Sequence, residues 1–516
     1  MPDRVAISTP DRDYTYADFD DRAARLAHVL RDAGVGEGDT VACYLYNSAA
    51  YLETVYAAFK LGAIPVNANY RYTGRELASL LIDADARAVV FSDGLAEHVR
   101  GLGEAVPTVA IMLRDGGVDG PDSYESAITA ARPLDREPRP GTDKLFMYTG
   151  GTTGRPKGVI WQHVDLLHSL AVPVYRPVGR DLPRSIADAV DAAVAVDRDG
   201  VLPVTMPVVP LMHATGLFNT IGTMLLGGTV ILANHRGLDP AVVWTTVSKK
   251  NVGTIIVAGN AVCVPLIDEL IAAEGRGAPH DLSPLRTVLS SGTSFSNELK
   301  EALHRRANVT ITDAIGSSEG GPFVFAVTHG VDDLPARFYP VPATKVFDDD
   351  DVEVVPGSGT VGVMAYSGPS PLGYYKDESK SALTFRTIGG VRYALPGDYV
   401  EVESDGSIRF LGRQSGVINS GGEKVHPQEV EDALQSHPAV RDCVVVGVPD
   451  AKWGEQVAAV VAVGTSAEVT ERELIDWARK DLAGYKIPRT IVILNELART
   501  PTGKIEIAWA KKQLTG

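Results

Sequence analysis

The stretch MYTGGTTGRPKGVIW, residues 147–161, carries the densest set of groups that could do chemistry. Successive backbone N–H groups of a tight glycine loop form a concavity that binds phosphate oxygens. Lys157 would add a positive charge to such a cradle, and three threonines would add hydroxyl groups: Thr149, Thr152 and Thr153. The plainer interpretation is a turn after a strand at 144–148. These residues alone leave both interpretations open.

Two better-known phosphate motifs do not fit this chain. A P-loop needs G-x-x-x-x-G-K-[ST] at the start of a helix, but here Lys157 follows Pro156 and precedes Gly158. GSGTVG at 357–362 matches G-x-G-x-x-G in form, but it runs into VMAY, which is typical of a strand rather than a helix. We therefore expect a turn at 357–362 and no helix at the lysine.

Two single carboxylates stand where a nucleotide could use them. Glu319 follows an apolar strand in ITDAIGSSEGG, and one carboxylate with phosphates and a hydroxyl is a usual way to hold Mg²⁺. Asp398 follows the Pro-Gly turn of YALPGDYV, and a carboxylate is the usual acceptor for ribose hydroxyls. Taken alone, each is more often a solvated turn residue.

Two further stretches lie nearer the end of the chain. GRQSGVINSGGEKVHPQEVE at 412–431 holds Arg413 and a tight Gly421–Gly422 loop, and Pro427 is placed to open a helix. ARTPTGKIEIAWA at 498–510 places Lys504 between a turn and a final helix. Without other evidence, Lys504 would be an ordinary solvated lysine.

Strands alternating with helices would position these residues. Apolar, β-branched runs predict strands at 41–46, 88–92, 145–148, 229–232, 254–259 and 287–291. Helical spacing after Thr15, ended by Gly34, predicts a first helix, and further helices are expected at 49–61 and 265–274. The alternation indicates an α/β fold with largely parallel sheets, in which ligands bind beyond the carboxyl ends of the strands.

The texture changes along the chain. Residues 171–200 predict a surface excursion with one short helix, and residues 340–410 predict a mostly β subdomain. A compact α+β pattern follows residue 413, with helices at 427–436, 470–482 and 506–514 and strands at 441–447, 456–463 and 490–495. A length of 516 residues requires two or more domains.

The composition excludes several classes of protein. A net charge of −16 argues against a nucleic-acid-binding surface, and no apolar run reaches the roughly 18 residues of a membrane span. Cys43, Cys263 and Cys443 are far apart and flanked by apolar residues, so we expect buried thiols rather than disulfides or a zinc site. A cytoplasmic protein is expected.

Together the motifs resemble those of the adenylate-forming enzymes, which include acyl-CoA synthetases, peptide-synthetase adenylation domains and luciferases. The family's motifs occur in its order: the 148–158 loop, PLMHATG at 210–216, SSGTS at 290–294, GSSEG at 316–320, PGD at 396–398, the 412–431 stretch and TPTGK at 500–504. The style of these motifs is similar to that of bacterial fatty-acid and steroid-side-chain CoA ligases.

The resemblance implies an N-terminal adenylation core at 1–412, with two α/β sheets and a small β subdomain, and a mobile α+β domain at 413–516. It also implies ATP, Mg²⁺ and coenzyme A. A carboxylate would attack the α-phosphate of ATP, and a thiol would then displace AMP from the acyl-adenylate. The acid would be bulky and apolar: a fatty, steroid or terpenoid acid.

The resemblance also assigns roles to residues. The cradle would hold the β- and γ-phosphates, with Thr149 and Glu319 near Mg²⁺, Asp398 on the ribose and Arg413 on the ribose or α-phosphate. Lys504 would bridge the attacking carboxylate and the α-phosphate. The remaining nucleotide contacts would come from Gly150, Gly151, Thr152, Thr153, Gly154, Lys157, Gly292, Thr293, Asp313, Ala314, Ile315, Gly316, Ser317 and Ser318.

In the thioester step, the small domain would turn about a hinge after Arg413 and bring Gly421, Gly422 and Lys424 in to line a thiol tunnel. His213 and Gly316 would border the acyl pocket, although His213 could instead be packed under a loop. His213 stands where amino-acid-activating relatives carry an Asp, which counts against an amino-acid substrate.

Two positions depart from the family pattern. Ile315 replaces the usual aromatic residue on adenine, and Ser415 replaces the common hinge Asp. Two alternatives remain: transfer of the acyl group to a carrier-protein phosphopantetheine, and a non-catalytic nucleotide-binding relative. Whether the chain acts alone or as a homodimer stays open.

Overall fold

The computed structural model describes residues 1–149, 156–175, 178–233, 237–413, 416–420, 423–450, 454–464, 469–499 and 505–515. The chain divides into two compact units. Unit 1 comprises Met1–Gly321, Val327–Ala336 and Gly368–Phe385, and unit 2 comprises Pro322–Ala326, Arg337–Ser367 and Arg386–Gly516.

A seven-stranded sheet in unit 1 has the order β18-β8-β7-β4-β3-β5-β6. Its strands are β3 (Thr40–Tyr44), β4 (Ile64–Asn67), β5 (Ala86–Ser92), β6 (Ile111–Asp115), β7 (Lys144–Thr149), β8 (Lys157–Gln162) and β18 (Gly373–Tyr374). The five strands from β7 to β6 are parallel, while β8 and β18 run antiparallel to their neighbours.

The other sheet of unit 1 contains β13, β12, β11, β9, β10, β1 and β2 in that order. These strands are β1 (Val5–Ser8), β2 (Asp13–Thr15), β9 (Val204–Pro207), β10 (Thr229–Ile231), β11 (Thr254–Val257), β12 (Thr287–Ser291) and β13 (Thr310–Ser317). All are parallel except the edge strand β2. The expected α/β architecture with largely parallel sheets is therefore confirmed.

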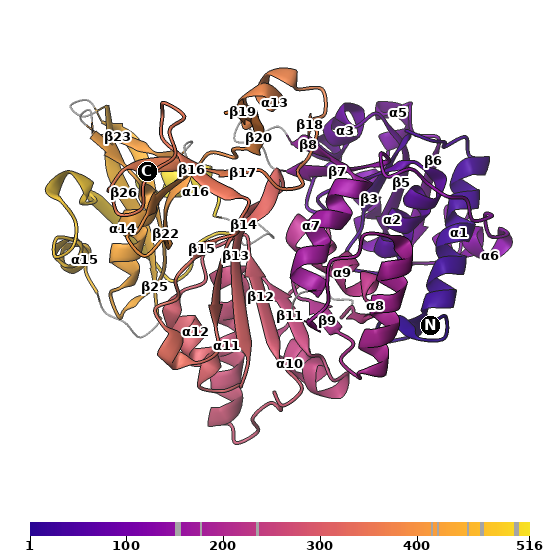
Figure 1. Ribbon diagram of the computed structural model, residues 1–516, viewed down its shortest axis with the longest axis horizontal. Coiled ribbons are helices and arrows are strands. Elements are labelled where there is room, and N and C mark those ends of the chain that lie inside the picture. Colours follow the sequence, from indigo (N-terminus) through magenta and orange to yellow (C-terminus); the bar gives the residue numbers. More distant parts are fainter. Residues whose placement is uncertain are drawn as a thin grey trace. The chain divides into compact units, whose positions relative to one another are not determined.

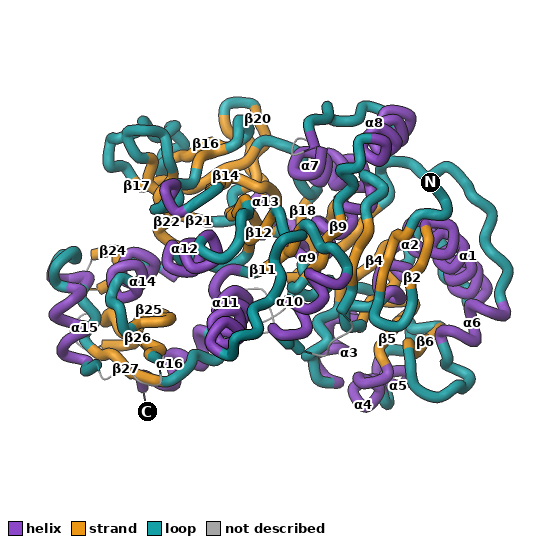
Figure 2. The backbone as a smooth tube through the Cα atoms, turned by 90° about the horizontal axis from the view of Figure 1, so that it is seen from below, coloured by secondary structure: helices purple, strands orange, loops and turns teal. Residues whose placement is uncertain are grey.

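Helices cover the sheets of unit 1, and two of them match the sequence prediction closely. Helix α1 (Tyr16–Asp32) begins at Thr15, whose side chain accepts from the Asp18 N–H in a capping box, and Gly34 follows its end with φ = +84°. Helix α2 (Ala49–Leu61) has the predicted bounds. Helices α1 and α2 pack side by side (Figures 1 and 2).

The other helices of unit 1 are α3 (Gly74–Asp83), α4 (Ala96–Val99), α5 (Leu102–Ala105), α6 (Tyr124–Ala130), α7 (His163–Tyr175), α8 (Ile186–Arg198), α9 (Ala214–Leu225), α10 (Pro240–Lys249), α11 (Gly259–Gly275), α12 (Asn297–His304) and α13 (Glu378–Thr384). Residues 171–200 contain the end of α7 as well as α8, which is longer than the short helix expected there. Helix α11 begins six residues before the predicted 265, directly after the N-cap Ala258, and its first residue, Gly259, has a positive φ of 44° that glycine adopts readily.

Unit 2 begins with a β subdomain, as the sequence predicts. One sheet has the order β19-β20-β17-β21-β22, and β16 also pairs with β17. Its strands are β16 (Thr344–Phe347), β17 (Val361–Tyr366), β19 (Phe385–Ile388), β20 (Val391–Ala394), β21 (Asp398–Val402) and β22 (Ile408–Arg413). Within unit 2, Val324 and Phe325 of β14 (Gly320–Thr328) pair with β15 (Tyr339–Pro340). Gly357 and Gly359 have positive φ just before β17, so the stretch at 357–362 starts with the expected turn.

The last part of unit 2 forms a five-stranded sheet with the order β24-β23-β26-β25, and β27 also pairs with β26. Its elements are β23 (Ile418–Ser420), β24 (Glu423–Val425), α14 (Pro427–Gln435), β25 (Val440–Asp450), β26 (Gly454–Val463), α15 (Glu471–Ala478), β27 (Thr490–Leu494) and α16 (Ile507–Thr515). The expected helices and strands are present, and the β23–β24 hairpin was not anticipated.

Two further expectations concern the cysteines and membrane-spanning helices. Cys43, Cys263 and Cys443 are buried free thiols, and burial raises the pKa of each. In the part of the chain that the structure describes, we find no helix with the length and apolarity needed to cross a membrane.

Candidate active site

The glycine-rich stretch at 149–158 joins two strands of a hairpin. Thr149, the last residue of β7, is the cross-strand partner of Lys157, the first residue of β8. A strand begins at the lysine, so the expectation that no helix starts there is confirmed. Residues Gly150–Gly154 of the predicted cradle lie outside the described residues. Gly158 is required by packing, because a Cβ there would lie 2.7 Å from the Tyr148 ring.

Lys157 is held at the base of this hairpin by a carboxylate. Its amino group forms an ion pair with Asp377, which lies just before α13 and accepts from the Lys380 N–H at 3.0 Å. The hydrogen bond from Lys157 lowers the pKa of Asp377 to about 2. A phosphate bound in the hairpin loop would compete with this carboxylate for the lysine.

Glu319 is tied to the same hairpin through a tyrosine. The Tyr374 hydroxyl donates to Glu319 Oε1 at 2.7 Å, and Tyr374 of β18 pairs with Val159 of β8. The Trp161 indole N–H of β8 donates to the Ser318 carbonyl at 3.0 Å. The turn that carries Glu319 is therefore fixed against β8, two residues from Lys157.

The donors available here fit a cation that is shared with phosphate. Among the described residues, no three or more His, Cys, Asp or Glu side chains gather in a way that could hold a metal ion alone. Glu319 spends one acceptor position on Tyr374, and a carboxylate has roughly four. The Glu319 carboxylate and the Thr149 hydroxyl are oxygen donors of the kind that Mg²⁺ prefers, so they would suit that ion if phosphate is bound nearby.

Residues predicted to face adenine lie at adjacent carboxyl ends of β12 and β13. Ser291 pairs with Ala314, so Gly292 and Ile315 follow side by side. Gly292 has φ = +97°, and the Thr293 hydroxyl donates to the Ala258 carbonyl at 2.9 Å. The predicted Gly316 and Ser317 are the last residues of β13, Ser318 follows them, and all three are partly exposed.

The side chain of Asp313 has a structural contact instead. It is buried and accepts from the Lys300 ammonium of α12 at 2.8 Å. Burial raises the pKa of Asp313, while the charge of Lys300 opposes that rise. The side chain of Asp313 therefore fixes β13 against α12, so a nucleotide could contact only the backbone of this residue.

Sequence reasoning missed the residues that hold the 292–296 loop. A Cβ on Gly259 would lie 2.1 Å from the Ser294 carbonyl oxygen, so only glycine allows this close approach. The Asn260 N–H donates to Ser294 at 2.7 Å, and its side chain accepts from the Ser296 N–H at 2.9 Å. A short Gly-Asn pair after a strand was the only local signal.

His213 stands at the N-cap position of α9, after a tight PLM turn. Its N–H donates to the Pro210 carbonyl at 3.2 Å. Gly216 of the first turn is required, because a Cβ there would lie 2.4 Å from that same carbonyl oxygen. A Cβ on Gly292 would lie 3.9 Å from the Thr215 hydroxyl, so the start of α9 adjoins the adenine loop.

In unit 2, Asp398 and Arg413 are cross-strand partners in β21 and β22. Asp398 is buried and follows Gly397, whose φ is +90°. Lys424 lies in β24, and Gly421–Gly422 follow the end of β23 but lie outside the described residues, as does Ser415.

Lys504 also lies outside the described residues, but its flanks do not. Arg499 and Ile505 form an antiparallel bridge on either side of residues 500–504. Arg499 forms an ion pair with Asp442 of β25. The short segment with the lysine therefore starts and ends at residues anchored to the C-terminal sheet.

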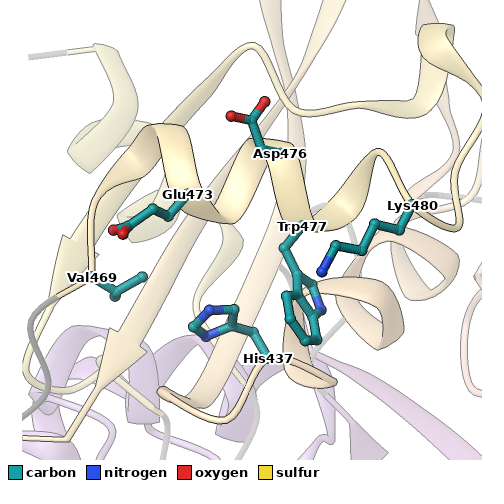
Figure 3. A pocket seen from close by; sticks show the side chains of 6 residues that line it. All are labelled: His437, Val469, Glu473, Asp476, Trp477 and Lys480. Carbon is teal, nitrogen blue, oxygen red and sulfur yellow. The ribbon is translucent and has the colours of Figure 1, made fainter.

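A cavity of about 310 Å³ opens on the surface of unit 2 beside α15 (Figure 3). The Lys480 ammonium lies 3.7 Å from the centre of the Trp477 ring, and His437 meets the same ring edge-on at 4.8 Å. None of the predicted site residues lines this cavity: its lining is His437, Val469, Glu473, Asp476, Trp477 and Lys480.

The sequence matches two family models. Residues 1–375 match the AMP-binding enzyme family, and residues 429–504 match the AMP-binding enzyme C-terminal domain. The 3-oxocholest-4-en-26-oate–CoA ligase of Rhodococcus rhodochrous is 39% identical, over 99% of this chain and 93% of the relative.

Two further comparisons agree. A medium/long-chain-fatty-acid–CoA/3-oxocholest-4-en-26-oate–CoA ligase of Mycobacterium tuberculosis (strain H37Rv) is 41% identical, over 99% of this chain and 94% of the relative. Among solved structures, the anthranilate CoA ligase AuaEII in complex with anthranoyl-AMP superimposes with a TM-score of 0.82 at 25% identity, covering 98% of this chain and 93% of that one.

Proposed function

The chain belongs to the AMP-binding enzyme family and is an AMP-forming acid–thiol ligase, and we propose that its acid is bulky and apolar, of fatty-acid or steroid-acid type. The observation that carries this proposal is the identity of 39% and 41%, over 99% of the chain, to ligases whose names specify such acids. ATP and coenzyme A are the co-substrates of this chemistry.

The first half-reaction requires charge compensation above all. An anionic carboxylate attacks an anionic α-phosphate, so cations and hydrogen-bond donors around the phosphoryl oxygens lower the barrier most. We assign the β- and γ-phosphates to the hairpin loop between Thr149 and Lys157. The ion pair of Lys157 with Asp377 supports this role, because it holds the lysine at the base of the loop.

Glu319 and Thr149 are the proposed ligands of Mg²⁺. When bound, the ion would neutralise charge on the phosphates and fix their orientation. Tyr374 orients Glu319 for this task through its hydrogen bond of 2.7 Å. Asp398 and Arg413, as cross-strand partners, would serve the ribose and the α-phosphate region.

Adenine would rest against Gly292–Thr293 on one side and the backbone of residues 313–315 on the other. Ile315 offers an aliphatic contact there in place of aromatic stacking. Gly316, Ser317 and Ser318, at the end of β13, would complete this wall.

Lys504 is proposed to bridge the attacking carboxylate and the α-phosphate, carried by a mobile domain at 413–516. The thioester step would use another orientation of that domain, hinged after Arg413 near Ser415. Lys424 and Gly421–Gly422 would then line the path of the thiol. A rigid rotation about a few residues is an established way to alternate two sets of contacts.

The acyl pocket would begin at His213. An imidazole there offers no fixed negative charge to bind an α-ammonium, which supports an acid without an amino group. Nearby, the partly exposed side chains of α9 include the apolar Ala214 and Phe218. Apolar walls favour apolar acids because binding removes hydrocarbon surface from water.

A panel of carboxylic acids tests the substrate class. Purified enzyme is incubated with ATP, Mg²⁺, CoA and short, medium and long fatty acids, aromatic acids, amino acids and steroid side-chain acids, and pyrophosphate and acyl-CoA are measured. We expect kcat/KM to rise with apolar surface. A preference for short acids or amino acids would contradict the proposal. Replacing CoA with a holo carrier protein in the same assay shows which of the two thiols accepts the acyl group.

Lys504→Ala tests the two-step assignment. Loss of one transition-state donor should slow adenylation on the order of 10²–10³-fold. Thioester formation from supplied acyl-adenylate should be retained. Lys512→Ala, on the exposed face of α16, is the matched control and should leave both steps unchanged. Equal loss of both steps in Lys504→Ala would rule out alternation.

A further inference from the structure

Asn67 makes a set of contacts that links two parts of unit 1. It is the last residue of β4 in the seven-stranded sheet, and it is buried. Its side-chain amide donates to the Tyr148 carbonyl at 2.8 Å and to the Met212 carbonyl at 2.7 Å. Its side-chain oxygen accepts from the Tyr148 N–H at 2.5 Å.

The two segments that Asn67 joins come from different sheets. Tyr148 lies in β7, immediately before Thr149, where the glycine loop begins. Met212 lies after β9 of the other sheet, immediately before His213. One side chain therefore fixes the residue before the phosphate loop relative to the residue before the acyl pocket.

Only asparagine satisfies all three contacts. Its amide offers two N–H donors and an acceptor oxygen, and each is used here. An aspartate would place carboxylate oxygens against two carbonyl oxygens, and a glutamine would be one methylene too long. Because the site is buried, losing these contacts would leave backbone groups unsatisfied.

Asn47 makes a related but separate contact. Its amide donates to the Val209 carbonyl at 3.0 Å, and its oxygen accepts from the Leu211 N–H at 2.7 Å. It therefore holds the same 209–212 segment, through hydrogen bonds to Val209 and Leu211 rather than to Tyr148. The chain thus supplies a control that touches the acyl side alone.

We propose that Asn67 is a positioning residue for adenylation: it sets the phosphate loop at a fixed place relative to the acyl pocket, so that the bound acid and ATP meet in register. This inference rests on the proposed function. It follows from the convergence of three hydrogen bonds on two segments that would each hold a different substrate.

Loss of Asn67 would change the distance between the bound substrates rather than remove a reacting group. Asn67 would touch neither substrate, and removing it would leave every reacting group present. A shift of about 1 Å between reacting groups can cost on the order of 100-fold in rate. Adenylation, which needs both ATP and the acid in place, should suffer more than thioester formation from a ready-made acyl-adenylate.

Asn67→Asp and Asn67→Ala test the proposal in the full-length enzyme, with Asn47→Ala as the matched control. We expect both Asn67 variants to slow adenylation about 100-fold and to raise the KM values of ATP and of the acid. Thioester formation from supplied acyl-adenylate should fall less than tenfold. Asn47→Ala should raise the KM of the acid and leave that of ATP unchanged.

Calorimetric titration with ATP gives a readout that does not depend on turnover. We expect the Asn67 variants to bind ATP at least fivefold more weakly than the wild type and Asn47→Ala to match the wild type. If the wild-type enzyme activates no acid, the proposed function fails. If it activates acids and the folded Asn67 variants match it in ATP affinity and adenylation, the proposed function stands and the positioning role fails.

Thermal unfolding separates positioning from a general loss of structure. Asn67→Ala removes the contacts without placing a carboxylate against the two carbonyl oxygens, so it is the variant to use if Asn67→Asp does not fold. Unchanged ATP affinity and adenylation in a folded Asn67 variant would overturn the proposal. Equal loss of both half-reactions would do the same.

Discussion

Within the described residues, the side chain of Glu319 is oriented by the hydroxyl group of Tyr374. Tyr374 is itself firmly placed: its ring is buried, the Lys380 ammonium lies 4.5 Å from the ring centre, and its backbone pairs with Val159. A donor that cannot move fixes its acceptor. The carboxylate proposed to hold Mg²⁺ is therefore preorganised before any nucleotide binds, which removes a reorganisation cost from the reaction.

Tyr374→Phe removes this hydroxyl and keeps the ring. A hydrogen bond to a charged group is worth about 1.5–3 kcal/mol, so we expect adenylation to slow about tenfold or more. The Mg²⁺ concentration for half-maximal rate should rise, as measured by pyrophosphate release at varied Mg²⁺. Tyr375→Phe is the matched control, because the Tyr375 hydroxyl donates to Asp85 at 2.6 Å instead. Equal effects of the two variants would refute the role of Tyr374.

At the scale of elements, the start of α9 depends on a close backbone approach. Gly216 lets the first turn of the helix rest on the Pro210 carbonyl, and this places His213 at the N-cap. The PLMHATG motif is thus a turn and a helix start that require each other. The glycine explains why the motif needs a small residue three positions after the histidine.

Gly216→Ala should displace the turn and the pocket that follows it. Overpacking costs about 1–3 kcal/mol, so we expect the KM of the acid to rise about tenfold or more. The KM of ATP should change less, as measured by steady-state adenylation with each substrate varied. Gly275→Ala, at the end of α11, is the matched control, because a Cβ there meets nothing within 4 Å. An unchanged KM of the acid would contradict this account.

The sequence predicts elements well where the signal is local. Thr15 and Gly34 mark the two ends of α1, because helix capping depends on residues that are neighbours in the sequence. The hairpin that carries the phosphate loop could not be predicted in register, because Lys157 finds its partner Thr149 only after folding.

Contacts between distant segments leave no periodic pattern in the sequence. Asn67 and Asn260 each hold a loop of the proposed site, yet the hydrogen-bond partners of an isolated asparagine cannot be predicted from the residues around it. Asp313 illustrates the converse: it belongs to a recognisable motif, but its side chain pairs with Lys300 in the interior. Motifs therefore indicate which segments form the site, while packing decides which atoms of a motif face it.

At the scale of the whole molecule, the two family models match separate stretches, and the proposed mechanism uses them in turn. In that mechanism the C-terminal sheet would have to keep its own fold while the domain turns. The long β25–β26 ladder and α14 supply that core, with buried Val430, Leu434 and Val461. Glu431 of α14 lies beside this core, and we expect it to make the stability of this part depend on pH.

Glu431 of α14 accepts from the Val445 N–H at 2.9 Å, and Asp432, Asp442 and Arg499 are the nearby charges. Burial raises the pKa of Glu431 to about 7. Because the folded-state pKa lies above the unfolded value, the stabilising contribution is complete below about pH 4.5 and is lost as the pH rises to about 7.

Glu431→Gln keeps the acceptor oxygen and removes the titration. We expect the variant to match the wild type near pH 4.5 and to be more stable at pH 8, by at most about 3 kcal/mol. Urea unfolding followed by circular dichroism at both pH values measures this. Glu473→Gln is the control, because hydrogen bonds from Thr470 lower the pKa of Glu473 and reverse the sign. If the free energy of unfolding of Glu431→Gln tracks that of the wild type at both pH values, Glu431 does not titrate as a buried acid.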